Sequence, residues 1–234
     1  MLDRILRPIG GKVSTVAGID VSHFQQAIDW NAAANSGVRF CFIKATEGSS
    51  IVDARFATNW QGAADAGVMR GAYHFFHPSI PVGAQVDLFV RTVQPLKVSD
   101  LPPVLDLEAP AEWTNIPAAN RAGLALQWLE GVHDRLGIRP LIYLSPSFAN
   151  ETLQNATTLA SYPLWIAHKT PAQNPDIPKP WTAWTFWQYS DQGQTAGIGT
   201  LVDADRFNGT MDALQALSLS ARAIQSPLLS GRKS

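Results

Sequence analysis

Two acidic residues one position apart, Asp106 and Glu108, form the most informative pattern in the sequence. They flank Leu107 directly after the apolar run 102–105. Side chains two apart on a strand point to the same face, about 6.5–7 Å apart, and two carboxyl groups held so close cannot both ionise easily. We expect Glu108, the longer side chain, to keep a proton that it donates to a glycosidic oxygen. We expect Asp106 to stay ionised and to stabilise developing positive charge.

Other acids follow or lie on separate apolar runs. Asp20 ends the first run, and Asp203 and Asp205 lie on the last. If these runs are barrel strands, we expect the acids to meet at one mouth, where such barrels carry their chemistry. Other roles fit as well: Asp20 can cap a turn, Asp205 can pair with Arg206 or Arg139, and a capping or ion-pair role suits both Asp203 and Asp205. From residue types alone, a functional and a structural interpretation of the acids stand about even.

Other chemistries fit the sequence poorly. The five histidines show no zinc-ligand spacing, and there is no Gly-x-Ser-x-Gly elbow or phosphate-cradling glycine loop. We therefore expect no metal and no cofactor, and we interpret His74 and His77 as rim or core residues. Cys41, the only cysteine, lies in an apolar run and is expected to be a buried, inert thiol.

Short apolar runs alternate with helical patterns over the first two thirds of the chain. Strands are predicted at 16–22, 40–44, 69–76, 103–107 and 140–144, with helical patterns between them. Three further predicted strands, at 163–167, 184–189 and 201–207, follow without clear helices. Alternating β and α segments predict a parallel sheet, and eight strands can close it. We therefore predict a single-domain α/β fold, a TIM-like (β/α)5(β)3 barrel. A doubly wound open sheet is the main rival.

The composition is that of one globular domain. Of the 234 residues, 46% are hydrophobic and 16% charged, and the net charge is −1. Without a basic excess we expect neither nucleic acid nor a membrane as partner, and we expect a monomer. No signal-peptide run and no membrane-spanning run is visible. We assign 1–15 to an N-terminal extension, 16–215 to the barrel and 216–234 to a C-terminal tail. Each of the eight Trp can be a sugar platform, although a core position is favoured for any one.

Seven segments, in order, resemble glycoside hydrolase family 25, the lysozymes (muramidases) of the Chalaropsis type. Together they span about residues 16 to 212 and form a specific set. The segments are Gly18-Ile19-Asp20-Val21-Ser22-His23-Phe24-Gln25, Phe42-Ile43-Lys44-Ala45-Thr46-Glu47-Gly48, Gly71-Ala72-Tyr73-His74-Phe75, Leu105-Asp106-Leu107-Glu108, Pro163-Leu164-Trp165-Ile166-Ala167, Trp187-Gln188-Tyr189-Ser190 and Val202-Asp203-Ala204-Asp205-Arg206-Phe207-Asn208-Gly209.

The resemblance implies hydrolysis of the β-1,4 bond between N-acetylmuramic acid and N-acetylglucosamine in bacterial peptidoglycan, with retained configuration. It makes Glu108 the general acid/base, with Asp106 assisting and Asp20 and Asp203 completing an acidic floor. The substrate contacts that it implies are Tyr73, Tyr143, Trp165 and Gln188, and we place Asp205 beside them. Two acids on one strand favour a substrate-assisted route, in which the acetamide oxygen of the sugar attacks. Direct attack by Asp20 or Asp203 is the alternative.

Two positions depart from the usual family pattern. Phe24 stands where Trp is frequent, and Asp205 stands where Asn is common. Two other functions stay open: a non-catalytic glycan-binding or structural barrel, and a chitin-type N-acetylhexosaminide hydrolase. No signal peptide and no wall-binding module is visible, which fits a phage-type endolysin that acts on the bacterial cell wall after release, and equally a shortened chain or a cytoplasmic product, so the sequence leaves the localisation open.

Overall fold

Eight strands close into a barrel because β1 pairs with a neighbour on each side. The computed structural model describes residues 14–218. In this part of the chain β1 (Thr15–Val21) pairs in parallel with β2 (Phe40–Glu47) and antiparallel with β9 (Val202–Asn208). The remaining barrel strands are β4 (Met69–Phe75), β5 (Val104–Asp106), β6 (Leu141–Leu144), β7 (Leu164–Ala167) and β8 (Phe186–Gly193). The predicted (β/α)5(β)3 barrel is confirmed, and the open sheet is excluded.

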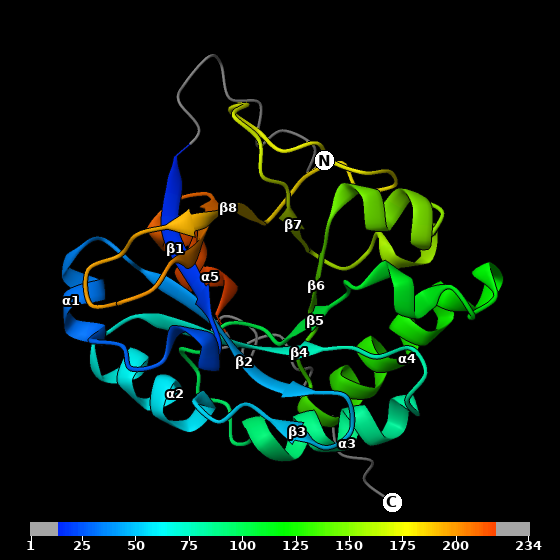
Figure 1. Cartoon of the computed structure of the whole chain (residues 1–234), viewed down its shortest axis with the longest axis horizontal. Helices are drawn as coiled ribbons and strands as arrows, with labels where there is room; N and C mark the ends of the chain where they lie inside the picture. Colours follow the sequence, from blue (N-terminus) through cyan, green and yellow to red (C-terminus); the bar gives the residue numbers. More distant parts are fainter. Residues whose placement is uncertain (1–13, 219–234) are drawn as a thin grey trace, which may run out of the picture.

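Helices follow the early strands and lie outside the barrel (Figure 1). They are α1 (Trp30–Asn35), α2 (Phe56–Asp65), α3 (Val82–Val93) and α4 (Ala118–Leu136). The Asp29 carboxylate caps α1 by accepting the Ala32 N–H at 3.0 Å, and Gly137 ends α4 in the left-handed conformation, with φ of 67°. Between β6 and β7 the chain forms only a π-helical turn, η3 (Phe148–Thr152), and a 3₁₀ turn, η4 (Thr157–Leu159).

The last strand runs against its neighbours. We expected a parallel sheet, but β9 is antiparallel to both β8 and β1. Only eight residues separate Gly193 from Val202, too few for a parallel crossover but enough for a hairpin. The start of β9 therefore lies at the end of the barrel where the parallel strands finish, which we call the mouth. Its last residue, Asn208, pairs with Thr15 at the opposite end.

The barrel interior is filled by aromatic side chains. Phe40 and Phe42 of β2 pack against Phe186, with ring centroids 5.1 and 4.9 Å apart. Gly18 makes room for this packing, since a Cβ at that position would lie 2.3 Å from the Phe40 ring. Because side chains alternate along a strand, the next inward-facing residue of β2 toward the mouth is Lys44. Below the mouth the barrel is therefore a packed core, and only its mouth offers space for a ligand.

A second apolar layer lies between the barrel and its helices. Seven of the eight Trp are buried, as is the free thiol of Cys41, which confirms the core interpretation of both. A short helix, α5 (Met211–Leu217), follows β9. No helix between residues 14 and 218 is long and apolar enough to cross a membrane. Most of the predicted extension (1–15) and tail (216–234) lies outside the described residues, so these boundaries stay predictions.

Candidate active site

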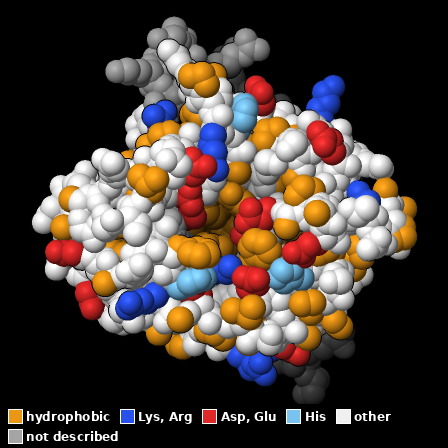
Figure 2. All heavy atoms as spheres, in the orientation of Figure 1, with side chains coloured by type: hydrophobic (Ala, Val, Ile, Leu, Met, Phe, Trp, Pro, Cys, Tyr) orange, Lys and Arg blue, Asp and Glu red, His pale blue; other side chains and the backbone are white. Residues whose placement is uncertain are grey.

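A cavity of about 270 Å³ opens at the mouth of the barrel. Figure 2 shows acidic, basic and histidine side chains gathered around this hollow. All eight barrel strands, or the loops that directly follow them, contribute to its wall. The lining residues are Asp20, Ser22, Phe24, Gln25, Lys44, Tyr73, Phe75, Asp106, Glu108, Tyr143, Trp165, Lys169, Gln188 and Asp203. The structure thus brings together all but one of the predicted site residues, Asp205.

The two acids of the Asp106-Leu107-Glu108 segment share this cavity at different depths. Asp106 ends β5 and is 4% exposed, whereas Glu108 lies beyond the strand and is exposed. Burial and the charge of Glu108 hold the pKa of Asp106 well above its ordinary value. Burial also raises the pKa of Glu108, but Lys44 and Asp106 oppose the rise. Both shifts favour the protonated forms, and the division of one proton between Asp106 and Glu108 stays a prediction.

One oxygen of Asp106 has no hydrogen-bond partner. Its Oδ1 is buried and receives no donor from the described residues. An unsatisfied buried carboxyl oxygen is costly unless a ligand supplies the missing donor. Asp106 lines the cavity, but its Oδ1 is itself almost fully covered, so an N–H or O–H group of a bound molecule can reach this oxygen only after the carboxyl group turns toward the cavity.

Lys44 is the buried cation beside the carboxyl pair. It is the third inward-facing residue of β2, after Phe40 and Phe42, and its charge lowers the pKa of both Asp106 and Glu108. Its ammonium group lies 2.6 Å from Glu47 Oε2 and 4.9 Å from the centroid of the Phe75 ring. Glu47 is the last residue of β2.

A buried amide connects two predicted site residues. Gln188 Nε2 donates to Asp20 Oδ2 at 2.8 Å, and Gln188 Oε1 accepts from the Tyr143 hydroxyl at 3.0 Å. Burial and the charges of Asp205 and Asp203 hold the pKa of Asp20 well above its ordinary value. These bonds fix Gln188 and present Asp20 as a hydrogen-bonded carboxyl group of the floor. They exclude the interpretation of Asp20 as a turn cap.

The acids of β9 occupy two layers. Asp203 lines the cavity, whereas Asp205 is 1% exposed and lies beneath it. Asp205 Oδ1 accepts the Trp165 indole N–H at 2.8 Å, and Arg206 instead lies over the Trp187 ring. The predicted substrate contact of Asp205 and its pairing with Arg206 are both corrected by this placement. Trp165 lines the cavity but is only 2% exposed. Only an edge of its ring is therefore open to a ligand, and no ring face is free to stack on a sugar.

The histidines near β4 have the structural roles expected of them. His74 is buried, bonds Thr46 and Gln85, and stacks on Trp128. Burial lowers its pKa to about 3, so it is neutral. His77 lies between Glu47 and Glu112, and none of these three residues lines the cavity. Within residues 14–218, no cluster of three or more His, Cys, Asp or Glu side chains is arranged to hold a metal ion.

The site continues beyond Glu108. A second cavity of about 360 Å³ shares Glu108, Tyr143, Lys169 and Gln188 with the first, and it extends between Ser145 and Thr152. The opposite rim carries Phe24, which is 70% exposed. Glu108 therefore stands in the middle of an elongated cleft, with room for a ligand on both sides.

The sequence model described as Glycosyl hydrolases family 25 matches residues 19–198. The chain belongs to this family. YegX, an uncharacterized protein of Escherichia coli K12, is 42% identical over 207 residues, 86% of this chain and 73% of YegX. Lysozyme M1 of Streptomyces globisporus is 37% identical over 225 residues, 91% of this chain and 74% of that protein. The lysozyme structure from Streptomyces coelicolor superposes with a TM-score of 0.84 at 34% identity, covering 89% of this chain and 99% of its own.

Membership of glycosyl hydrolase family 25 makes the protein a glycoside hydrolase, and the barrel matches that of the related lysozyme. Sequence reasoning missed six residues that line the first cavity of this family 25 enzyme: Ser22, Phe24, Gln25, Lys44, Phe75 and Lys169. Lys44 could have been found by counting alternate residues from Phe40, because both face the interior. Lys169 lies in an irregular segment and Phe24 lies on the short 3₁₀ turn η1 (His23–Gln25), where no periodicity indicates direction.

Proposed function

We propose that the protein is a peptidoglycan hydrolase that cleaves the β-1,4 bond between N-acetylmuramic acid and N-acetylglucosamine with retention. The observation that carries the proposal is the carboxyl pair, in which exposed Glu108 stands mid-cleft and Asp106 offers an unsatisfied Oδ1. The naming of Lysozyme M1 and of the Streptomyces coelicolor lysozyme supports the same substrate class. A cleft that extends to both sides of Glu108 suits cleavage within a glycan chain.

The unsatisfied oxygen suits the N-acetyl group of a bound sugar. We infer that the acetamide N–H donates to Asp106 Oδ1, which favours the ionised form of Asp106. The proton that the free pair holds then resides on Glu108, beside the scissile bond. Substrate binding thus favours the division of roles that general acid catalysis needs.

The reaction that follows has two balanced steps. The acetamide oxygen forms a bond to the anomeric carbon while the glycosidic C–O bond breaks, and Glu108 gives its proton to the leaving oxygen. The product is a cyclic oxazolinium ion, which is stabilised by ionised Asp106. Water then attacks the same carbon, gives a proton to Glu108 and opens the ring. Two inversions at the anomeric carbon give net retention.

Direct attack by Asp20 fits the geometry less well. Asp20 is buried, its Oδ2 already accepts a hydrogen bond from Gln188, and burial raises its pKa well above the ordinary value. A protonated, hydrogen-bonded carboxyl group is a weak nucleophile. Asp203 is less buried than Asp20, but its carboxyl group interacts with the positive charge of Lys169 and with the carboxyl group of Asp20.

Digestion of purified peptidoglycan tests the proposed bond. Fragments should end in reducing N-acetylmuramic acid, and Glu108→Gln should lower kcat by about 10²- to 10⁴-fold, the usual contribution of a general acid. Reducing N-acetylglucosamine ends, or faster cleavage of chitin oligomers, would indicate a chitin-type hydrolase. Binding without any product would indicate a glycan-binding barrel.

N-deacetylated glycan strands test the route. Without an acetamide at the sugar bound beside Glu108 the substrate-assisted step has no nucleophile, so cleavage should stop. Wild-type protein that cuts deacetylated strands at an unchanged rate would rule out this route and favour attack by Asp20 or Asp203. Asp106→Asn should leave binding of oligosaccharide largely intact while kcat falls, because it removes the charge that stabilises the oxazolinium ion.

A further inference from the structure

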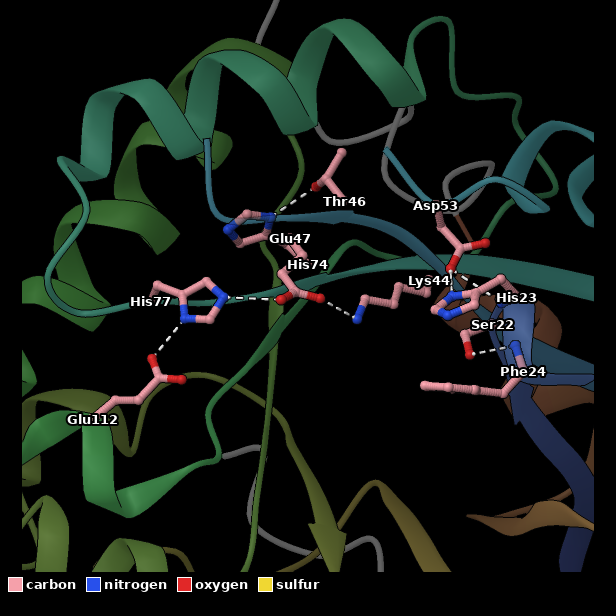
Figure 3. A network of polar contacts seen from close by, with 10 residues as sticks. All are labelled: Ser22, His23, Phe24, Lys44, Thr46, Glu47, Asp53, His74, His77 and Glu112. Carbon is pink, nitrogen blue, oxygen red and sulfur yellow. Dashed lines mark hydrogen bonds and ion pairs between the residues drawn. The ribbon is translucent and has the colours of Figure 1, made fainter. Parts of the chain in front are cut away.

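Four side chains of alternating charge form a row that leads outward from the cavity. Lys44 Nζ lies 2.6 Å from Glu47 Oε2, and Glu47 Oε1 lies 3.1 Å from His77 Nε2. His77 Nδ1 in turn lies 2.6 Å from Glu112 Oε2. Figure 3 shows the row, with His77 between the two carboxylates and Lys44 at its inner end.

The row joins three neighbouring segments of the mouth. Lys44 and Glu47 lie on β2, and His77 lies just after β4. Glu112 lies on the short 3₁₀ turn η2 (Pro110–Trp113), which begins two residues after Glu108. One end of the row therefore lies beside the carboxyl pair, and the other lies on the loop that carries the proton donor.

The environment favours the charged forms of Glu47 and His77. Burial raises the pKa of Glu47, but Lys44 and His77 outweigh it, and the net direction is downward. Burial lowers the pKa of His77, but Glu112 and Glu47 outweigh it, and the net direction is upward. Both ring nitrogens of His77 face a carboxylate, an arrangement that the doubly protonated imidazolium satisfies with two donors.

We propose that Glu47, held in place by His77 and Glu112, is a positioning residue that aims the Lys44 ammonium at the carboxyl pair. A lysine side chain has a flexible stem, so its charge acts on a neighbour only where something fixes it. Lys44 is buried, and its contacts are with Glu47 and the Phe75 ring. In this fixed position, the Lys44 ammonium stabilises one negative charge shared by Asp106 and Glu108, while the other carboxyl group keeps its proton. The inference rests on the proposed function.

The direction in which the pH–kcat profile shifts shows whether Glu47 positions Lys44 or acts on the carboxyl pair only through its own negative charge. Lys44→Met removes the cation, so the pKa values of the pair should rise and the pH–kcat profile should move to higher pH. If Glu47 aims Lys44, Glu47→Gln should move the profile in the same direction and lower kcat by about ten- to a hundredfold. If Lys44 stays in place without Glu47, the loss of a nearby negative charge lowers those pKa values, and the profile moves to lower pH. An acid shift, or no shift, overturns the proposal.

Other titratable groups also face the carboxyl pair of Asp106 and Glu108, and the comparison requires that they stay the same in every variant. They are Asp20, Asp203, Tyr73, Tyr143 and Lys169, and none of them is substituted in these variants. Asp87→Asn serves as the matched control, because it also removes an acid from an ion pair, with Arg135, on the outer surface of the helices. It should leave kcat and the pH profile unchanged, and circular dichroism should show that every variant keeps the wild-type fold.

A double variant and a conservative one complete the test. If Glu47 acts through Lys44, adding Glu47→Gln to Lys44→Met should change kcat by less than twofold and should not shift the pH–kcat profile further. If the two substitutions have additive effects on the activation free energy, the proposal is overturned. Lys44→Arg should recover part of the lost kcat, because a guanidinium can also bond Glu47. Carbon-13 NMR titration of the carboxyl groups in the free protein gives the same pKa directions without turnover. Wild-type protein that digests no cell wall would refute the proposed function, while the titration would still test the positioning.

Discussion

Asp203 lies directly opposite Asp20 in the antiparallel ladder that joins β9 to β1. Both side chains line the cavity, and the charge of Asp203 adds to burial and to Asp205 in raising the pKa of Asp20. The acidic floor therefore carries fewer negative charges near neutral pH than its number of carboxyl groups suggests. A floor of this kind can face a sugar without repelling its hydroxyl and acetamide oxygens.

Asp203→Asn should move the alkaline limb of the activity profile to lower pH. Burial raises the pKa of Glu108 and Asp203 adds to the rise, so neutralising Asp203 lets Glu108 lose its proton earlier. The pH dependence of kcat/KM on soluble muropeptide substrate measures this limb. Asp134→Asn, an equal change of charge on the exposed face of α4, should leave it in place. An alkaline limb that moves upward would contradict the assigned electrostatics.

Asp205→Asn should make the protein more stable above pH 4, increasingly so up to pH 8. Burial raises the pKa of Asp205 to about 8, so the folded state holds a proton that the unfolded state releases near pH 4. Stability from this group is therefore highest at low pH and falls as pH rises between these two values. Urea unfolding of both proteins at pH 4.5, 6 and 8 measures the difference. A constant difference across this range would show that Asp205 is ionised in the folded state.

Gly18→Ala should destabilise the barrel by about 1–3 kcal/mol, the usual cost of overpacking a core. Its Cβ would lie 2.3 Å from the Phe40 ring, which itself packs against Phe186. The matched control is Gly123→Ala, an exposed position within α4 where a Cβ meets nothing within 4 Å. That variant should gain up to about 1 kcal/mol from helix propensity. Equal unfolding free energies for the two variants would contradict the packed interior.

Phe24→Ala should raise KM for long glycan strands several-fold with little change in kcat. Phe24 is 70% exposed at the cavity rim, and its ring packs at a tilt against His23 with centroids 4.2 Å apart. His23 is held in turn by Asp53 at 2.8 Å. A rigid exposed ring suits the apolar face of a sugar far from the scissile bond. Phe24→Trp should lower KM or leave it unchanged, and a fall in kcat with constant KM in Phe24→Ala would place the ring at the reacting sugar instead.

Most of the fold and most of the site residues could be predicted from the sequence, and single residues show why. The alternation of apolar runs and helical patterns predicted the barrel because both periods are local properties of the chain. Period-two alternation on a strand likewise placed Asp106 on the inner face. The direction of β9 and the depth of Asp205 depend on pairing between residues nearly two hundred positions apart, which local patterns do not record.

The electrostatics around Asp106 and Glu108 could not be predicted from the sequence. Side-chain length suggested that Glu108 keeps the proton, but depth in the barrel raises the pKa of both groups and the position of Lys44 opposes the rise at both. Both are properties of the closed barrel. The row that ends at Glu112 was missed for a related reason, since its members come from three segments.

The pairing of Thr15 with Asn208 has a practical consequence for work with this enzyme. Both residues lie at the end of the barrel away from the cleft, so the chain enters and leaves its catalytic part on the same side. A tag, a solid support or an added carbohydrate-binding module joined near residue 14 or after α5 starts from the face opposite the glycan strand. Tethered in this way, the protein can press its open cleft flat against an insoluble wall.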